Sequence, residues 1–548
     1  MIDQLVGQEH STAKDAVAGL DATKAIDGLV IALIALISTI PYVGRIGFYS
    51  DDWSFLGALA VGNDHSFGTL FMATIRQVAT RPVQAAYLSG LYELFGANPL
   101  AFQLVAAGAL AIGGILAYLA LRRFAFNRVE ALVTAAIFVT LPSYSADRFW
   151  LSAAQALVSM CFFFASAYAL GRAGSPATAN WRSWLGLSAT ALLLSALAYE
   201  VFLPLFVVAA LALPIAVDVP AQRRWAIRII NPALVVLLGV TKAVFTTRLG
   251  GGGVSGQLSW LVHLVEGALK INGWDFGLAL PLNSVRMFAH HPSLVAAIAG
   301  ASAGALIYAW VVGSARTVST GRRLAVAGIV TFAGGYAIFL TNNNALMTPT
   351  GSGNRVNIAA AFGMALVITG AAIWVAGRFR RPTLSAQVLG VVAAGVVGFG
   401  VMTNVVLATY WEQASTTQSA VLAALKNDVP SLPANATLII DGVCPYVGPG
   451  VVFETTWDVT GALRMEYRSA SLTGDVATNR MWVASDGLHS FTYQTETIHP
   501  YSDLLLVYDY RTHGVVELTS ETAALAYFAA HPASACPAGS PGYGSGVM

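Results

Sequence analysis

Two adjacent carboxylates, Asp51 and Asp52, stand soon after the first long apolar stretch of the chain, in Phe48-Tyr-Ser-Asp-Asp-Trp53. Acidic side chains are costly close to hydrocarbon, so this position calls for a chemical reason. Adjacent residues project about 100° apart on a helix and to opposite faces of a strand. We therefore expect one acid to enter a cleft while its neighbour caps a helix or binds elsewhere. The alternative is that an acid only caps a helix beginning near Trp53.

Three arginines, Arg148, Arg248 and Arg355, stand in connections where membrane proteins rarely place arginine. A guanidinium presents a planar fork of donors that matches phosphate oxygens, so several around one cavity would suit a phosphate or pyrophosphate leaving group. For each arginine the alternative is a local carboxylate, such as Asp147 beside Arg148. The glycines at 250–253 have no strand before them and no Lys-Ser/Thr after them, which indicates a loop rather than a phosphate cradle.

Glu200 lies between two apolar stretches, in Ala198-Tyr-Glu-Val-Phe-Leu-Pro204. An ionisable side chain at such a border faces a polar cavity or pairs with a cation, unless it is a turn residue at the surface. Lys242 lies in an apolar stretch and could be the partner of Glu200 or a phosphate ligand. It could equally extend its ammonium group to the membrane surface. Arg81, followed by Pro82, is a further cation in the connection that the two acids open.

The composition is that of an integral membrane protein. Of the 548 residues, 56% are hydrophobic and 11% charged, and the mean hydropathy is +0.65. Soluble domains instead carry about 25% charged residues. The net charge of +2 and the lack of a basic patch give no indication of a nucleic-acid partner.

Apolar stretches of about 20 residues can cross a hydrocarbon core of roughly 30 Å. Eleven such stretches predict transmembrane helices, near 25–45, 98–121, 129–142, 150–171, 184–198, 200–217, 229–246, 293–313, 324–341, 357–377 and 385–408. If the N-terminus is cytoplasmic, every inner connection carries arginine, for example Arg122 and Arg123, as the positive-inside rule requires. The long connections and the C-terminal region then lie outside.

The fold expected from these patterns is an all-α polytopic membrane protein with a small β-rich extracytoplasmic domain at its C-terminus. Its parts are a cytoplasmic tail (1–24), a transmembrane domain (25–408) with an outer loop (46–97), an outer α+β domain (409–535) and a disordered tail (536–548).

Short apolar and β-branched runs predict strands in the outer domain, at Thr437–Asp441, Met481–Ala484 and Leu504–Tyr510. Trp411–Asn427 predicts an amphipathic helix at the membrane interface. Cys444 and Cys536 both fall in this domain, where an oxidising compartment would let them form a disulfide; two unpaired thiols are the alternative.

The organisation of most of the chain resembles the GT-C superfamily: a first span, a large outer loop opening with an acidic pair, Arg81-Pro82 later in that loop, further short-looped spans and an outer C-terminal domain. That superfamily comprises polytopic glycosyltransferases that use polyprenyl-phosphate sugars, among them protein mannosyltransferases, aminoarabinose transferases and arabinosyltransferases. One acid of its first outer loop acts as catalytic base or helps to hold a divalent metal. By position, Asp51 and Asp52 inherit this role, with Mg²⁺ or Mn²⁺ as the metal.

The resemblance implies sugar transfer from a polyprenyl-phosphate donor to a glycan, lipid or protein acceptor, outside a bacterial inner membrane and with inversion at the anomeric carbon. Cationic side chains would stabilise the departing phosphate, namely Arg355, Arg248, Arg148, Lys242 and Arg81. Trp53, Tyr199 and Glu200 would line the substrate site, although aromatic residues at membrane interfaces also form belts.

Two other classes of protein share these features. A transporter or flippase would have as many spans, but it usually places ionisable sites near the bilayer midplane in repeated halves. Neither a repeat nor an acid in the middle of a span is found here. A non-catalytic factor in cell-envelope polysaccharide assembly is the second alternative.

Overall fold

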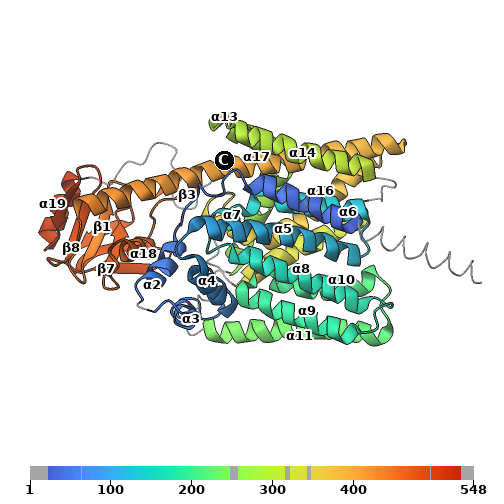
Figure 1. Cartoon of the computed structure of the whole chain (residues 1–548), viewed down its shortest axis with the longest axis horizontal. Helices are drawn as coiled ribbons and strands as arrows, with labels where there is room; N and C mark the ends of the chain where they lie inside the picture. The colour runs from blue at the N-terminus through green and yellow to red at the C-terminus, as the bar shows by residue number, and fades with distance from the viewer. Residues whose placement is uncertain are drawn as a thin grey trace, which may run out of the picture.

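The computed structural model describes residues 23–62, 64–246, 257–314, 321–341, 347–493 and 495–531. Long helices form a bundle at one end of the molecule, and a smaller domain of strands and short helices forms the other end (Figure 1). Three helices of the outer loop lie between these parts, namely α2 (Asp51–Ala60), α3 (Phe67–Ile75) and α4 (Pro82–Phe95). The predicted site residues therefore have to be sought where the bundle meets the smaller domain.

Every predicted span falls on a helix. The helices are 23–39, α5 (Pro99–Arg123), α6 (Arg128–Thr140), α8 (Gln155–Gly174), α9 (Trp181–Ala198), α10 (Leu203–Ala216), α11 (Ala221–Thr246), α14 (Leu294–Ser314), α15 (Arg322–Tyr336), α16 (Ile358–Ala376) and α17 (Pro382–Asp428). Within the described ranges, 7 helices are long and apolar enough to cross a membrane. The prediction of a helical polytopic membrane protein is confirmed, whereas the count of eleven crossings stays a prediction.

Local sequence explains where these helices begin and how they pack. At the start of α5, the Asn98 side chain accepts a hydrogen bond from the Leu100 N–H at 3.1 Å. Small residues let neighbouring helices approach closely: a Cβ added to Gly300 of α14 would come within 2.7 Å of the Gly398 oxygen of α17. Exposed apolar side chains on α11, such as Val236 and Leu237, suit a surface that faces lipid.

Shorter helical segments connect the spans. They are η1 (Pro142–Tyr144), α7 (Ala146–Phe149), η2 (Glu200–Phe202), α12 (Gln257–Ala268), the π-helix η5 (Leu269–Leu278), α13 (Leu280–His290), η6 (Ala337–Thr341) and η7 (Ser352–Asn357). Three of the segments carry residues predicted to act at the site, because α7 contains Arg148, η2 contains Glu200 and η7 contains Arg355.

The helix of the last predicted span is longer than a membrane crossing requires. Helix α17 is continuous for 47 residues, or about 70 Å at 1.5 Å per residue, and includes the predicted amphipathic helix Trp411–Asn427. Its C-terminal half carries the smaller domain, since the Gln418 amide donates to the Val452 carbonyl at 2.6 Å. One rigid helix thus links the bundle to the outer domain (Figure 1).

The outer domain contains strands at the predicted places, but its main sheet is largely parallel. The strands are β1 (Thr437–Asp441), β2 (Tyr446–Val447), β3 (Gly450–Val451), β4 (Thr473–Val476), β5 (Met481–Ala484), β6 (Gly487–Thr492), β7 (Thr495–His499), β8 (Leu505–Asp509) and β9 (Gly514–Glu517). The main sheet has the order β4-β1-β8-β9, with only β9 antiparallel, and β5-β6-β7 form a second sheet.

Helix α18 (Thr456–Tyr467) follows β3 and lies in the crossover that the parallel pairing of β1 with β4 requires, and α19 (Glu521–Ala530) follows β9. Thr455 and Asp458 form a capping box at the start of α18. Cys444 lies in this domain, but Cys536 lies outside the described residues, so the disulfide stays a prediction. The disordered tail 536–548 and residues 1–22 of the cytoplasmic tail also lie outside them.

Candidate active site

Asp52 is a buried structural acid. Its side chain is 3% exposed, and its carboxylate accepts hydrogen bonds from the backbone N–H groups of Tyr49 at 3.0 Å, Leu151 at 3.3 Å and Ser152 at 2.6 Å. Burial raises the pKa of this carboxyl to about 7, against the opposing effect of these hydrogen bonds. Asp52 therefore fastens the start of α2 to the segment between α7 and α8.

Asp51 has different surroundings, although it is the neighbouring residue. Its carboxylate forms no ion pair with any residue that the structure describes, yet the charges of Arg355 and Arg81 are close enough to lower its pKa. Burial is the larger effect, so the pKa of Asp51 lies above its usual value. The Trp457 indole lies beside this carboxylate, but its buried N–H has no well-formed hydrogen bond.

The turn before Asp51 is strained and is held by the outer domain. Ser50 has a φ of +46°, in a region that residues other than glycine rarely adopt. Its hydroxyl donates to Glu454 at 2.8 Å, and the same carboxylate accepts from Tyr493 at 2.9 Å and Tyr446 at 2.6 Å. Glu454 is 4% exposed, and burial raises its pKa. The outer domain thus fixes the backbone from which Asp51 projects.

Arg355 is a cation without a counter-ion among the described residues. Its guanidinium stacks over the indole of Trp150 at 4.4 Å and makes neither a hydrogen bond nor an ion pair within that part of the chain. Its charge acts on Asp51 and also on Asp147. An arginine that is fixed by stacking and keeps its donors unused can bind an anion.

Arg81, Glu200 and Lys242 form one ion-pair group. Arg81 donates to both Glu200 carboxylate oxygens, at 3.1 and 2.6 Å, and Lys242 donates to the same carboxylate at 3.0 Å. The Arg81 guanidinium lies 4.7 Å from the centre of the Tyr199 ring. Two cations around one acid leave a net positive charge, and the Arg81 charge also reaches Asp51.

The Arg148 side chain forms hydrogen bonds inside the bundle. It is 3% exposed and donates to the Ser38 hydroxyl at 2.9 Å and to the Val139 carbonyl at 2.5 Å. It forms no ion pair with Asp147, whose two carboxylate oxygens are buried without hydrogen-bond partners in the described chain. Burial raises the pKa of Asp147 well above its usual value. Arg248 lies outside the described residues.

The aromatic residue beside Asp51 is Trp457 and not Trp53. Trp53 packs against Phe48 and Phe453, with ring centres 6.0 and 6.4 Å away. Neither Trp457 nor Glu454 was predicted from the sequence. The signal for both was the capping-box pattern Thr455-Thr-Trp-Asp458, which places them at the start of a helix.

The donor set around Asp51 does not suit a divalent metal. Both Asp52 oxygens accept backbone N–H groups, and the Glu454 carboxylate, whose charge also reaches Asp51, accepts three hydroxyl groups. The arginine charges that reach Asp51 repel a cation. Among the described residues no group of three His, Cys, Asp or Glu side chains could hold a metal ion. The Mg²⁺ or Mn²⁺ expected from the resemblance is therefore without support in these contacts.

No protein-family model and no curated protein matches the chain. The chain is similar to the crystal structure of ArnT from Cupriavidus metallidurans in the apo state, with a TM-score of 0.38 and 15% identity over 83% of this chain and 85% of that chain. It is also similar to the same protein bound to undecaprenyl phosphate, with a TM-score of 0.36 and 16% identity over 81% and 89% of the two chains.

Proposed function

We propose that this protein transfers a sugar from a polyprenyl-phosphate donor to an acceptor at the outer face of the membrane. The observation that carries the proposal is that an acid and a cation near the start of α2 are both without an ion-pair partner within the described residues. The acid is Asp51, and the cation is Arg355, whose charge reaches Asp51. A displacement reaction needs a base that activates the nucleophile and a cation that stabilises the anionic leaving group, and these two residues can supply both.

In this reaction, Asp51 accepts the proton of an acceptor hydroxyl as its oxygen attacks the anomeric carbon of the donor. The new bond from carbon to oxygen forms on the face opposite the phosphate, and the bond from carbon to phosphate oxygen breaks. The electron pair leaves with the polyprenyl phosphate, whose charge is stabilised by Arg355. The sugar configuration is inverted because the attack is direct.

Arg81 and Lys242 support the departing phosphate through their net positive charge. Glu200 holds both cations in place, at 2.6 to 3.1 Å, and prevents their mutual repulsion from separating them. Asp52 and Arg148 have structural roles in this proposal, since their polar groups are bonded to backbone or hydroxyl groups of the protein. Tyr199 provides the ring on which Arg81 lies.

The proposed orientation places the outer domain and Asp51 on the non-cytoplasmic face of a bacterial inner membrane. Arginines gather at the opposite ends of the spans: Arg128 pairs with the buried Asp27 at 2.7 Å, and Arg323 donates to the Phe124 carbonyl at 2.5 Å. Such basic residues favour the cytoplasmic side. The N-terminus is then cytoplasmic, and the acceptor is a component of the cell envelope.

The test compares Asp51→Asn with Asp52→Asn in membranes supplied with a radiolabelled polyprenyl-phosphate sugar. We expect Asp51→Asn to lose at least about a hundredfold in transfer, the usual contribution of general base catalysis, at unchanged protein level and thermal midpoint. Asp52→Asn should lower the thermal midpoint, because its amide nitrogen cannot accept the N–H groups that Asp52 binds.

Full transfer by Asp51→Asn would eliminate Asp51 as the base. If the wild-type protein formed no glycan product but moved the labelled lipid across the membrane, the transporter alternative would replace the enzyme.

A further inference from the structure

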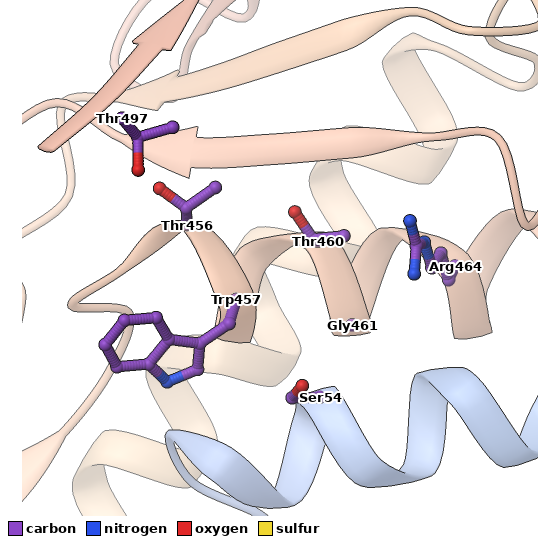
Figure 2. A pocket seen from close by; sticks show the side chains of 7 residues that line it. All are labelled: Ser54, Thr456, Trp457, Thr460, Gly461, Arg464 and Thr497. Atoms are coloured by element: carbon purple, nitrogen blue, oxygen red, sulfur yellow. The ribbon is translucent and has the colours of Figure 1, made fainter. Parts of the chain in front are cut away.

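A pocket of about 340 Å³ lies where the outer domain meets α2. It is lined by Ser54 of α2, by Thr497 of β7 and by residues of α18, namely Thr456, Trp457, Thr460, Gly461 and Arg464. Figure 2 shows Thr456, Thr460 and Arg464 along the side of α18 that faces the strand of Thr497, with Ser54 across from Gly461. Its volume is within the range of about 300 to 1,000 Å³ that is usual for small-molecule sites.

This pocket adjoins the proposed base. Ser54 follows Asp51 by three residues on α2, so the two side chains share one face of that helix. Trp457 both lines the pocket and lies beside the Asp51 carboxylate. A molecule that fills the pocket can therefore present a hydroxyl group to Asp51.

The lining combines an indole with several groups that bind hydroxyls. Arg464 is oriented by its Nε, which donates to the Leu472 carbonyl at 3.0 Å, while its two terminal nitrogens make no hydrogen bond within the described chain. Thr497 offers a hydroxyl that is likewise unused by the described residues. A sugar ring presents C–H groups on its faces and hydroxyls at its rim, and an aromatic wall with a few polar donors suits both.

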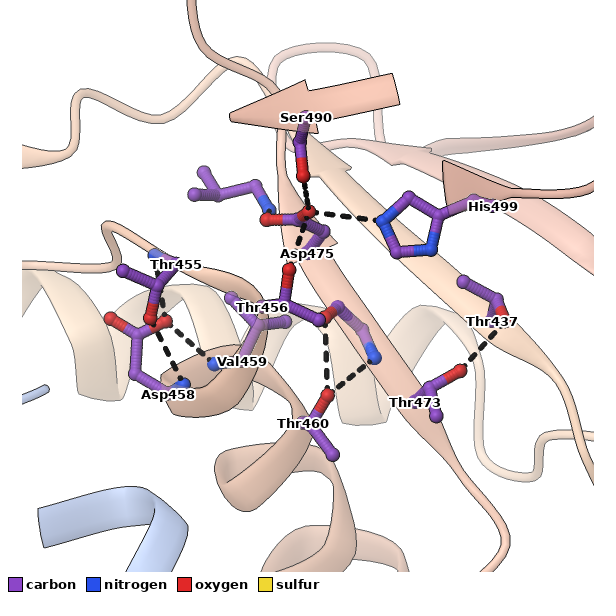
Figure 3. A network of polar contacts seen from close by, with 12 residues as sticks. Thr437, Thr455, Thr456, Asp458, Val459, Thr460, Thr473, Asp475, Ser490 and His499 are labelled. Carbon is purple, nitrogen blue, oxygen red and sulfur yellow. Dashed lines mark hydrogen bonds and ion pairs between the residues drawn. The ribbon is translucent and has the colours of Figure 1, made fainter. Parts of the chain in front are cut away.

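Buried hydrogen bonds keep the wall of the pocket in place. Asp475, which is 2% exposed, accepts from Thr456 at 2.8 Å, from Ser490 at 2.6 Å and from His499 at 3.0 Å (Figure 3). Thr460 donates to the Gly474 carbonyl at 3.1 Å. These contacts join α18 to β4 and to the second sheet, so the pocket is built into the fold rather than formed by a loose surface.

We infer that this pocket binds the acceptor, and that the acceptor is a saccharide. The inference rests on the proposed function, because it assigns the second substrate of the same reaction. Trp457 provides the surface for one sugar ring, Arg464 and Thr497 bind its hydroxyls, and the attacking hydroxyl lies toward Asp51.

The experiment uses the full-length protein in membranes with labelled donor and, as acceptor, a protease-treated polysaccharide extract of the cell envelope at increasing concentration. The variants are Arg464→Gln and Thr497→Val. The control is Arg468→Gln, which removes the same charge at a residue outside the pocket. We expect Arg464→Gln to raise the concentration of extract for half-maximal transfer about tenfold or more, the effect of losing a charged hydrogen bond. Thr497→Val should raise it several-fold, and Arg468→Gln should match the wild type.

Each outcome separates the two ideas. If both pocket variants reached half-maximal transfer at the same extract concentration as the wild type, the pocket would not bind the acceptor. The proposal that Asp51 is the base of the transfer would remain. An acceptor activity that is present in untreated extract and absent from the protease-treated extract would overturn the saccharide assignment in favour of a protein acceptor. Failure of the wild-type protein to transfer sugar to any fraction would refute the proposed function, and this inference with it. Because Thr497→Val is nearly isosteric on a strand, it answers the question even if Arg464→Gln folds poorly.

Discussion

Asp51 can act as a base only while its carboxylate is ionised, so the rate of transfer should rise with pH through the pKa of this group. Burial places that pKa above its usual value, and the charges of Arg355 and Arg81 oppose the effect. Removing a nearby positive charge makes the carboxylate harder to ionise. The surroundings of one residue therefore set the acid side of the pH profile.

We predict that Arg355→Gln moves the acid limb of the kcat/KM profile to higher pH, in addition to lowering the maximum rate through loss of phosphate binding. The measurement is the pH dependence of the transfer rate of wild type and variant at an acceptor concentration far below saturation, with Arg468→Gln as the control. An acid limb at the wild-type pH in Arg355→Gln would show that Arg355 does not act on the base.

Part of this site could be predicted from the sequence. The different roles of two adjacent acids followed from the geometry of a helix, and pairing of Glu200 with Lys242 was one of the alternatives considered. The contact of Ser50 with Glu454 could not be predicted, because the two residues are 404 positions apart and no local sequence pattern indicates that they pack together. The use of Arg148 inside the bundle could not be predicted either, since its partners are backbone carbonyls and the hydroxyl of Ser38, 110 positions away in the sequence.

At the scale of elements, the position of Asp51 depends on how α2 packs against α18. A Cβ added to Gly57 would come within 2.6 Å of the Gly461 backbone, and a Cβ on Gly461 would overlap the Trp53 carbonyl. Only glycine permits this close approach, so the crossing point of the two helices fixes the distance between Asp51 and Trp457.

Gly461→Ala should separate the two helices, at a cost of about 1 to 3 kcal/mol in stability, and should reduce transfer more than it reduces the amount of folded protein. The measurements are the thermal midpoint in detergent and the transfer rate per folded molecule. Glu466→Ala, on the exposed side of α18, is the matched control and should resemble the wild type. Normal transfer by Gly461→Ala would show that this crossing does not position the base.

The periodic spacing of hydrophobic residues predicted the positions of the spans and of several strands well, because these elements depend on local sequence. Thr437–Asp441 and Met481–Ala484 are strands with the expected bounds. The parallel order of the main sheet was not predicted, since it follows from the crossover through α18, and single short runs carry no information about their partners. Helix α17 likewise continues beyond the predicted span, because Trp411–Asn427 keeps a helical pattern into the outer domain.

At the scale of the whole molecule, α17 sets how the outer domain sits on the bundle. Thr416 is exposed on the part of α17 that packs on the outer domain, between Ala414 and Gln418, so its own side chain can be replaced without disturbing packing. Proline at an interior helical position costs about 3 kcal/mol and bends the helix.

Thr416→Pro should therefore move Glu454 and Trp457 away from the start of α2 and abolish most transfer, whereas Thr416→Ala should have little effect. Limited proteolysis should reveal new cleavage near the substitution, and the transfer assay should report the loss of activity. Transfer at the wild-type rate in a Thr416→Pro protein with a bent helix would show that the outer domain is dispensable for the reaction.

Under the proposed function, the bond between Ser50 and Glu454 also sets the stage of synthesis at which activity can begin. A ribosome releases Ser50 and the first span some 404 residues before it reaches Glu454. During that interval the growing chain already holds Asp51, Arg81 and the backbone groups that bind Asp52, but it lacks the Glu454 carboxylate that binds Ser50. A nascent or truncated chain would thus be inserted in the membrane yet inert toward the lipid-linked sugar, and activity would start only once translation is nearly complete.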